Sequence, residues 1–401
     1  MVRLGPQPYL SAVKQFYRVR KVVGLVPLPS CTYLFCDLDV YHSNNLNYFF
    51  FPGGWNNPLI ADWFAAYAQV AYSRFADRVK FWNTINEPAV VCEMANSGML
   101  APGIDERLMA PYLCNKNILL AHAKAWRIYD EQFKSLYKGR VALVNHLVWF
   151  EPATEDTPQE LVDLTQEFLT GRYSHPIYSE KGGWPQNVEK FMEEASRRQG
   201  FNVSKLPTFT EEEKKLIRGT HDFYALNQYT TRLVRRTRPG EDPGIWFLSG
   251  SPELDIVVEF DPEWEMGASS LFVYPPGLRK QLGWLKATYG DLDYIITENG
   301  YSTFGSDLHD HKRIKFIYDH LEQILLSIKI DNVNVIGYTY WSLIDNYEWM
   351  DGYRTKFGLY EIDFNDPDLT RIPRQSAQYY ASHCFIVLII TDGTNFSTIV
   401  M

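Results

Sequence analysis

Six short apolar runs recur along the chain, and helical patterns separate them. Each run is rich in β-branched and aromatic residues; the runs lie near Cys31–Leu38, Val79–Asn86, Val141–Leu147, Phe223–Asn227, Tyr294–Thr297 and Val335–Trp341. Alternation of such runs with helices is typical of a parallel sheet, and a closed barrel of this kind needs eight units. The sequence therefore predicts an α/β fold, a (β/α)8 TIM-type barrel. Its first two units are expected to be missing or degenerate, because Met1–Ser30 shows no clear unit.

Two of the intervening segments carry a single apolar stripe. One stripe contains Leu119, His122, Trp126, Tyr129 and Phe133, and the other contains Ile314, Ile317, Leu321, Ile324 and Ile328. Steps of three and four residues are those of the buried face of a helix. His122 lies on such a stripe, so we interpret it as a core residue. Three charged or Gly/Pro-rich segments are expected to be loops over a barrel rim: Glu180–Pro185, Pro207–Lys215 and Arg235–Pro243.

Length and composition allow one large barrel domain as readily as two smaller domains. A chain of 401 residues with 46% apolar content can bury the core of a whole barrel. We expect an N-terminal segment at 1–30, the barrel at 31–382 and an apolar tail at 383–401. The tail run Cys384–Ile390 has strand character and is too short to span a bilayer.

Charge and motif content exclude several classes of partner. Lys plus Arg minus Asp plus Glu is 39 − 48 = −9, and no basic run is present, so nucleic acid is not expected as a partner. The five cysteines are too scattered for a disulfide framework and lack metal-ligand spacing. The His309–His311 cluster is interpreted as a solvated helix start rather than a metal site. Without a phosphate-binding glycine loop or nucleotide fingerprint, no cofactor is expected.

The N-terminal residues carry no recognisable signal peptide. The stretch from Met1 to Gly24 is interrupted by Pro6 and Pro8, so it lacks the apolar core of a signal peptide. The compartment and the oligomeric state are therefore not indicated, although a lost N-terminus could have carried a signal.

Two glutamates stand at the ends of apolar runs, Glu87 and Glu298, separated by 298 − 87 = 211 positions. The strands of a barrel deliver their last residues to one face, so these carboxylates can meet across a substrate. Retaining cleavage of a glycosidic bond needs a protonated carboxyl and an ionised one about 5 Å apart. An apolar wall including Trp82 and Pro88 is expected to raise the pKa of Glu87. Asn299 and Tyr229 are candidate donors that keep Glu298 charged.

Three ordered motifs resemble glycoside hydrolase family 1, the β-glucosidase and thioglucosidase family. Thr84–Pro88 resembles its acid/base signature, Ile296–Ser302 its nucleophile signature, and Trp341–Trp349 the segment that grips the sugar. The likeness extends from about Gly53 to about Tyr380. It implies that Glu87 is the acid/base and Glu298 the nucleophile. The implied substrate-binding residues are Asn86, Asn227, Tyr229, Trp341, Glu348 and Trp349.

The chain departs from the family pattern at several positions. The family's first two strands, with a sugar-binding glutamine and an arginine beside the nucleophile, have no counterpart. Phe35 stands where the family carries a sugar-binding histidine, and Cys36 where it carries a tryptophan. Arg172 and the Leu271–Phe272 pair replace residues that are often tryptophan. These differences concern the sugar and the aglycone side.

Two hypotheses on function remain at this point. The first is a retaining β-glycosidase that hydrolyses O-glycosidic bonds of β-glucoside-like small molecules through a glycosyl–Glu298 intermediate. The alternative is a catalytically impaired family member or truncated product that binds carbohydrate, or a thioglucosidase. Glu87 favours O-glycosides over thioglycosides, because sulfur needs less acid assistance on leaving.

Overall fold

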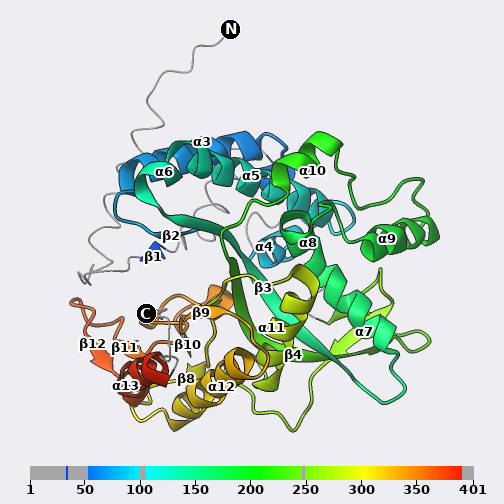
Figure 1. Ribbon diagram of the computed structural model, residues 1–401. Coiled ribbons are helices and arrows are strands. Elements are labelled where there is room, and N and C mark those ends of the chain that lie inside the picture. Colours follow the sequence, from blue (N-terminus) through cyan, green and yellow to red (C-terminus); the bar gives the residue numbers. More distant parts are fainter. Residues whose placement is uncertain (1–32, 35–52, 100–104, 246–248, 391–401) are drawn as a thin grey trace. The chain divides into compact units, whose positions relative to one another are not determined.

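The computed structural model describes residues 33–34, 53–99, 105–245 and 249–390; for 33–34 and 384–390 only the backbone is described. Figure 1 shows its parallel strands, which are β1 (Tyr33–Leu34), β2 (Phe81–Asn86), β3 (Arg140–Pro152), β4 (Tyr224–Arg236), β7 (Tyr294–Glu298) and β9 (Val335–Tyr338). Each strand overlaps one of the six predicted runs. The predicted α/β barrel class is therefore confirmed.

The parallel strands pair in the order β1-β2-β3-β4-β7-β9. Antiparallel additions are β6 (Ile256–Glu259) on β4 and β5 (Gly250–Ser251) on β6, and two separate pairs, β8 (Thr303–Phe304) with β10 (Thr355–Lys356) and β11 (Tyr360–Ile362) with β12 (Arg371–Pro373). Among the described strands, β1 pairs only with β2 and β9 only with β7. The described sheet is thus open between β1 and β9, which is compatible with the expected absence of two units.

Helices alternate with these strands along the chain. They are η2 (Gly54–Asn56), α3 (Ile60–Phe75), α4 (Pro88–Asn96), α5 (Ala110–Gln132), α6 (Lys134–Tyr137), α7 (Gln159–Gln166), the π-helical η3 (Glu167–Gly171), α8 (Arg172–Tyr178), α9 (Gln186–Arg198), α10 (Glu211–Ile217), α11 (Pro276–Tyr289), α12 (His311–Lys329), η4 (Trp349–Asp351) and α13 (Gln375–Ile390). Among those that pack against the sheet are α5, α7, α11 and α12. In Figure 1, α3 and α5 lie side by side and pack together.

The two faces of each strand belong to different parts of the core. On β3, Val141 and Leu143 pack in the large cluster that joins the sheet to the helices. Their neighbours Ala142 and Val144 point the other way, into a small cluster that also contains Ala225 of β4. This alternation follows from the two-residue period of a strand. The small cluster fills the barrel interior. The residues that follow it along β3 and β4 lie at the carboxyl ends of these strands.

The predicted helical stripes are confirmed by α5 and α12. Leu119, Tyr129 and Ile317 are fully buried, and Ile324 is nearly so. His122 is buried as well, hydrogen-bonded by its two ring nitrogens to Thr84 Oγ1 and to the carbonyl of Thr220, each at 2.7 Å. Burial lowers the pKa of His122 to about 4. The interpretation of His122 as a core residue is confirmed.

Two local predictions are wrong. Pro207–Lys215 was expected to be a loop, but α10 begins at Glu211, because Thr210 and Glu213 form a reciprocal capping box across its first turn. The strand character of the Cys384–Ile390 run is also not realised, since α13 continues as a helix to Ile390. Glu180–Pro185 is a loop as predicted, whereas the predicted loop from Arg235 starts only after β4 ends at Arg236.

Covalent and membrane features complete the fold. Cys92 of α4 and Cys114 of α5 form a disulfide; the scattered spacing of the cysteines in the sequence gave no sign of this pair. No helix among the described residues is long and apolar enough to cross a membrane.

Candidate active site

Glu87 lies between the end of β2 at Asn86 and the start of α4 at Pro88. It is the residue before the first turn of α4, Pro88 occupies the first helical position, and the Glu87 amide donates to the carbonyl of Val144 at 2.9 Å. Pro is favoured there because its missing N–H would have no helical partner. Glu87 itself adopts φ 48° and ψ 56°. This left-handed conformation costs an ordinary residue about 1–2 kcal/mol, so the surrounding structure holds Glu87 in place.

One amide links the acid/base candidate to its neighbours. Asn227 lies on β4, and its Nδ2 donates to Glu87 Oε1 at 2.9 Å and to Asn86 Oδ1 at 3.0 Å. Its Oδ1 accepts a hydrogen bond from Thr297 on β7. Because every polar atom of this side chain is engaged, its orientation is fixed. Asn227 therefore aligns the ends of three strands.

Glu298 is the last residue of β7, and its carboxylate accepts hydrogen bonds from two neutral side chains. Asn86 Nδ2 donates to Glu298 Oε1 at 3.1 Å, and Tyr229 OH donates to Glu298 Oε2 at 2.7 Å. Glu298 as a whole is only 7% exposed. Burial, together with the nearby charges of Glu298 and Glu87, raises the pKa of Tyr229 well above its ordinary value, so this hydroxyl stays a donor. Both glutamates therefore share one hydrogen-bonded network.

The surroundings of Glu87 differ from the apolar wall that the sequence suggested. Trp82 points to the helix side, where it meets Tyr72 edge-on at 4.8 Å. Glu87 instead contacts His146 of β3, whose Nδ1 lies 3.1 Å from Glu87 Oε1. Burial raises the pKa of Glu87, but the charge of His146 and the hydrogen bonds from His146 and Asn227 outweigh it, so that pKa lies below its ordinary value. The predicted upward shift of the Glu87 pKa is therefore wrong.

His146 was not singled out from the sequence. It lies inside the apolar run Val141–Leu147, which we interpret as a strand. The signal that could have found it is the strand period, because Ala142, Val144 and His146 form one inward row.

The sugar-grip segment adjoins this network. Trp341 Nε1 donates to Glu348 Oε1 at 3.2 Å. The Trp341 amide donates to the carbonyl of Asn299, the residue after Glu298, and Glu348 acts electrostatically on Tyr229. Trp349 follows in η4 with a half-buried side chain and φ 47°. The segment therefore extends the site beyond the two glutamates.

Other residues considered from the sequence have different surroundings. Asn299 does not donate to Glu298; its Nδ2 donates to the carbonyl of Gln228 at 2.7 Å, and its Oδ1 accepts from Tyr338 at 2.9 Å. Arg172 is fully buried and donates to Glu93 Oε1 at 2.8 Å, so it is a core ion pair. Phe35 and Cys36 lie outside the described residues.

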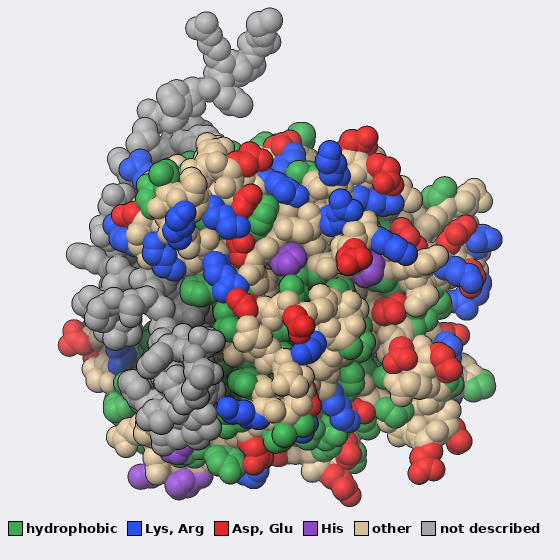
Figure 2. All heavy atoms as spheres, in the orientation of Figure 1, with side chains coloured by type: hydrophobic (Ala, Val, Ile, Leu, Met, Phe, Trp, Pro, Cys, Tyr) green, Lys and Arg blue, Asp and Glu red, His purple; other side chains and the backbone are tan. Residues whose placement is uncertain are grey.

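Two further observations concern the charged side chains outside this site. Figure 2 shows cationic and anionic side chains interspersed on the face that it presents. Within the described part of the chain, no three His, Cys, Asp or Glu side chains are arranged to hold a metal.

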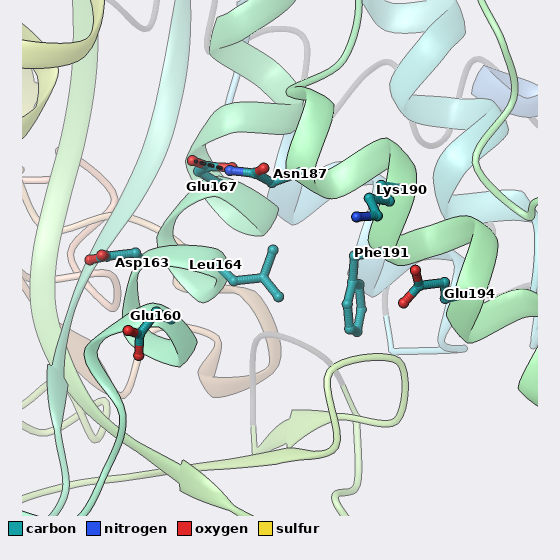
Figure 3. Close-up of a pocket in the computed structure, with 8 residues that line it drawn as sticks. All are labelled: Glu160, Asp163, Leu164, Glu167, Asn187, Lys190, Phe191 and Glu194. Carbon is teal, nitrogen blue, oxygen red and sulfur yellow. Dashed lines mark hydrogen bonds between the residues drawn. The ribbon is translucent and has the colours of Figure 1, made fainter.

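A hollow of about 470 Å³ lies between the region of α7 and η3 and α9 (Figure 3). Glu167 and Asn187 hydrogen-bond across it at 3.3 Å. Its lining residues are Glu160, Asp163, Leu164, Glu167, Asn187, Lys190, Phe191 and Glu194. All of them lie on α7, η3 or α9, and none takes part in the hydrogen-bonded network of Glu87 and Glu298, so this hollow is separate from that site.

Comparisons with known proteins agree with this geometry. The chain matches the model of glycosyl hydrolase family 1 over residues 39–385. It is 40% identical over 345 residues to Myrosinase 1 of Brevicoryne brassicae, covering 85% of this chain and 72% of that protein. It is 38% identical over 337 residues to the cytosolic beta-glucosidase of Homo sapiens, covering 82% and 70%. A solved aphid myrosinase matches with a TM-score of 0.77 at 40% identity, covering 82% and 70%. The chain belongs to glycosyl hydrolase family 1.

Proposed function

We propose that this family 1 hydrolase is a retaining β-glycosidase that cleaves O-glycosidic bonds of β-glucoside-like substrates by double displacement at two glutamates. One observation carries the proposal: Asn227, Asn86 and Tyr229 join Glu87 and Glu298 in a single hydrogen-bonded network at the carboxyl ends of the strands. Such an arrangement provides the pair of carboxyl groups that retaining cleavage requires.

In the first step, Glu298 attacks the anomeric carbon while the bond to the aglycone oxygen breaks. Glu87 gives its proton to that oxygen, and a glycosyl ester forms on Glu298. The hydrogen bonds from Asn86 and Tyr229 suit this role, because neutral donors stabilise the carboxylate without adding a fixed positive charge beside it.

In the second step, water attacks the anomeric carbon and the ester bond to Glu298 breaks. Glu87, now ionised, accepts the proton of the water, which restores both groups. The released sugar keeps its β configuration, since the anomeric carbon is inverted twice.

The remaining residues are proposed to hold the sugar. Trp341 stacks on the glycone, because the C–H face of a pyranose packs on an indole. Glu348 and Trp349 bind its outer hydroxyls, with charge-assisted bonds to the Glu348 carboxylate. Asn86 binds the hydroxyl next to the anomeric carbon.

A thioglucosidase is the second candidate, favoured by the likeness to proteins named myrosinase. A thioglycoside leaves with little acid assistance, so such an enzyme does not need Glu87 as a proton donor. The hydrogen-bonded carboxyl of Glu87 favours the O-glycosidase. The relative rates of hydrolysis of phenyl β-glucoside and phenyl β-thioglucoside distinguish the two candidates. If the chain cleaves both substrates, a Glu87→Gln variant should lose activity on phenyl β-glucoside only.

A non-catalytic carbohydrate-binding protein is the third candidate, favoured by the opening between β1 and β9 in the described sheet. The test is release of nitrophenol from 4-nitrophenyl β-glucoside by the 401-residue chain, with Glu298→Ala as control and circular dichroism to check folding. We expect turnover that the variant lacks, and trapping by a 2-fluoroglucoside on the peptide containing Glu298. A folded chain that binds glucose but neither turns over nor traps the inhibitor would contradict the proposal.

A further inference from the structure

We propose that His146 is a positioning residue of this reaction that shares the catalytic proton with Glu87, so that the two side chains act as one proton-holding pair. The inference rests on the proposed function of Glu87 as acid/base. It assigns a task to a histidine that the two-glutamate mechanism does not itself require.

The strand period directs His146 into the site. Ala142 and Val144 of β3 and Ala225 of β4 line the barrel interior. The next inward positions toward the carboxyl ends are His146 and Asn227, which are direct neighbours in the parallel register of β3 and β4. Both side chains therefore leave the sheet at the same level and on the same face. The backbone fixes their approach to Glu87.

His146 and Asn227 converge on the same atom, Glu87 Oε1. The His146 Nδ1 contact is 3.1 Å and the Asn227 Nδ2 bond is 2.9 Å. The Nδ2 group of Asn227 can only donate a hydrogen bond, whereas an imidazole nitrogen can give up its proton. The His146 and Glu87 side chains are 10% and 13% exposed, so bulk water exchanges with them only through a small opening.

Other ionisable groups around the pair set its electrostatics. Glu298 and Tyr229 lie across the site, and Glu348 acts on Tyr229 as well. Two further carboxylates therefore face this region, and Tyr229 stays neutral because burial raises its pKa. A positive charge on His146 is thus balanced, and the pair can store a proton as imidazolium and carboxylate.

The proton is conserved through the cycle. Before the first step, the Nδ1–H bond of His146 breaks and an O–H bond forms on Glu87 Oε1, leaving two neutral groups. That proton then passes to the aglycone oxygen as the glycosidic bond breaks. In the second step, the proton of the attacking water returns to Glu87 and redistributes to His146. No other reactant is needed.

The experiment compares the pH dependence of kcat/KM for His146→Asn and for the unchanged chain. The amide of asparagine can still donate to Glu87 but cannot carry a proton to it. Phenyl β-glucoside serves as substrate because its leaving group needs acid, and 2,4-dinitrophenyl β-glucoside as the substrate that does not. His221→Asn is the matched control, since His221 is partly buried against Tyr178 and outside the site.

When His146 and Glu87 can both hold the same proton, the pair binds that proton at least as tightly as Glu87 does alone. We therefore expect His146→Asn to move the basic limb of the kcat/KM profile for phenyl β-glucoside to lower pH by about one unit. The limb for 2,4-dinitrophenyl β-glucoside, and both limbs in His221→Asn, stay in place. An unchanged or upward-shifted limb would mean that His146 only donates a fixed hydrogen bond, and would overturn the proposal.

A measurement independent of turnover separates this inference from the proposed function. The ring ¹⁵N signals of His146 are followed against pH in the unchanged chain and in Glu87→Gln. Proton sharing predicts that the His146 ring loses its proton at lower pH once Glu87 is amidated. Equal titration in both proteins refutes the pair even if the enzyme is active. Absence of turnover with a shifted titration refutes the glycosidase and leaves the pair intact.

Discussion

Two glutamates six positions apart have opposite surroundings: Glu93 is buried, and the Glu87 side chain is 13% exposed. Glu93 lies in α4, where the fully buried guanidinium of Arg172 contacts it at 2.8 Å. Glu87, just before the same helix, contacts an amide and an imidazole. Burial raises the pKa of Glu93 even beside Arg172, whereas His146 and the hydrogen bonds bring the pKa of Glu87 below its ordinary value. A carboxylate with a permanent cation stabilises the fold, and one with neutral or exchangeable donors remains available for chemistry.

The largest expected effect is at the nucleophile position. Glu298→Gln should lower kcat for 4-nitrophenyl β-glucoside by at least about 10⁴-fold, because no ester can form. Its thermal midpoint should stay close to that of the unchanged chain, since an amide keeps an acceptor for Tyr229. Calorimetry and initial rates measure both. A large loss of stability would break the comparison by showing that Glu298 also supports the fold.

Arg172→Met should have the reverse profile. It leaves the Glu93 charge buried without its cation, which costs about 3–5 kcal/mol of unfolding free energy, while the activity of the folded fraction is retained. Urea unfolding measures the free energy of unfolding, and active-site titration measures the activity per folded molecule. Equal losses of activity per folded molecule would show that the ion pair serves the site directly.

The same variant has a defined pH dependence. Burial raises the folded-state pKa of Glu93 above its unfolded-state value, so the folded state binds more protons in that window, and stability rises as the pH falls through it. Loss of the Arg172 charge raises the folded-state pKa of Glu93 further, so the pH range between the unfolded-state and folded-state pKa values becomes wider. The deficit of Arg172→Met should therefore shrink between pH 7.5 and pH 5, and a constant deficit would contradict a charge-based cause.

Tyr229→Phe sharpens the comparison from the side of the neutral donors. It removes the 2.7 Å bond to Glu298 and little volume. We expect kcat to fall by about 10²- to 10³-fold, as for the loss of one preorganised donor. The melting temperature serves as the control for packing. A change confined to KM would assign Tyr229 to sugar binding instead.

The smallest expected effect comes from removing both members of the ion pair. The double variant Glu93→Met and Arg172→Met should recover to within about 1 kcal/mol of the unchanged chain, because replacing both charges by apolar groups avoids the desolvation penalty. A double-mutant cycle in urea gives the coupling energy. If the double variant is as unstable as Arg172→Met, shape rather than charge dominates in this layer.

The strands and the helical stripes could be predicted because both are periodic. Leu119, Tyr129 and Ile317 repeat at helical spacing, and they are buried on one face. Glu87 and Glu298 could be selected because they end two apolar runs. Their meeting at one face was expected from a barrel, but the hydrogen bonds that join them through Asn227 and Asn86 depend on the register of strands far apart in the chain.

Other features depend on three-dimensional neighbours or on weak local signals. Trp82 faces helices rather than Glu87, because adjacent side chains of a strand point to opposite faces. The charged stretch after Thr210 looked like a loop until its capping pair was considered. Cys92 and Cys114 are joined only because α4 and α5 pack together, which spacing in the sequence does not determine.

The left-handed backbone at Glu87 has a consequence for engineering and evolution. At φ 48° and ψ 56°, glycine or asparagine relieves strain that glutamate carries. A selection for heat resistance alone would therefore favour replacing the proposed acid, by roughly the 1 kcal/mol that such a relief provides. Libraries built on this scaffold should hold position 87 constant, since its contribution becomes visible only when turnover is scored together with stability.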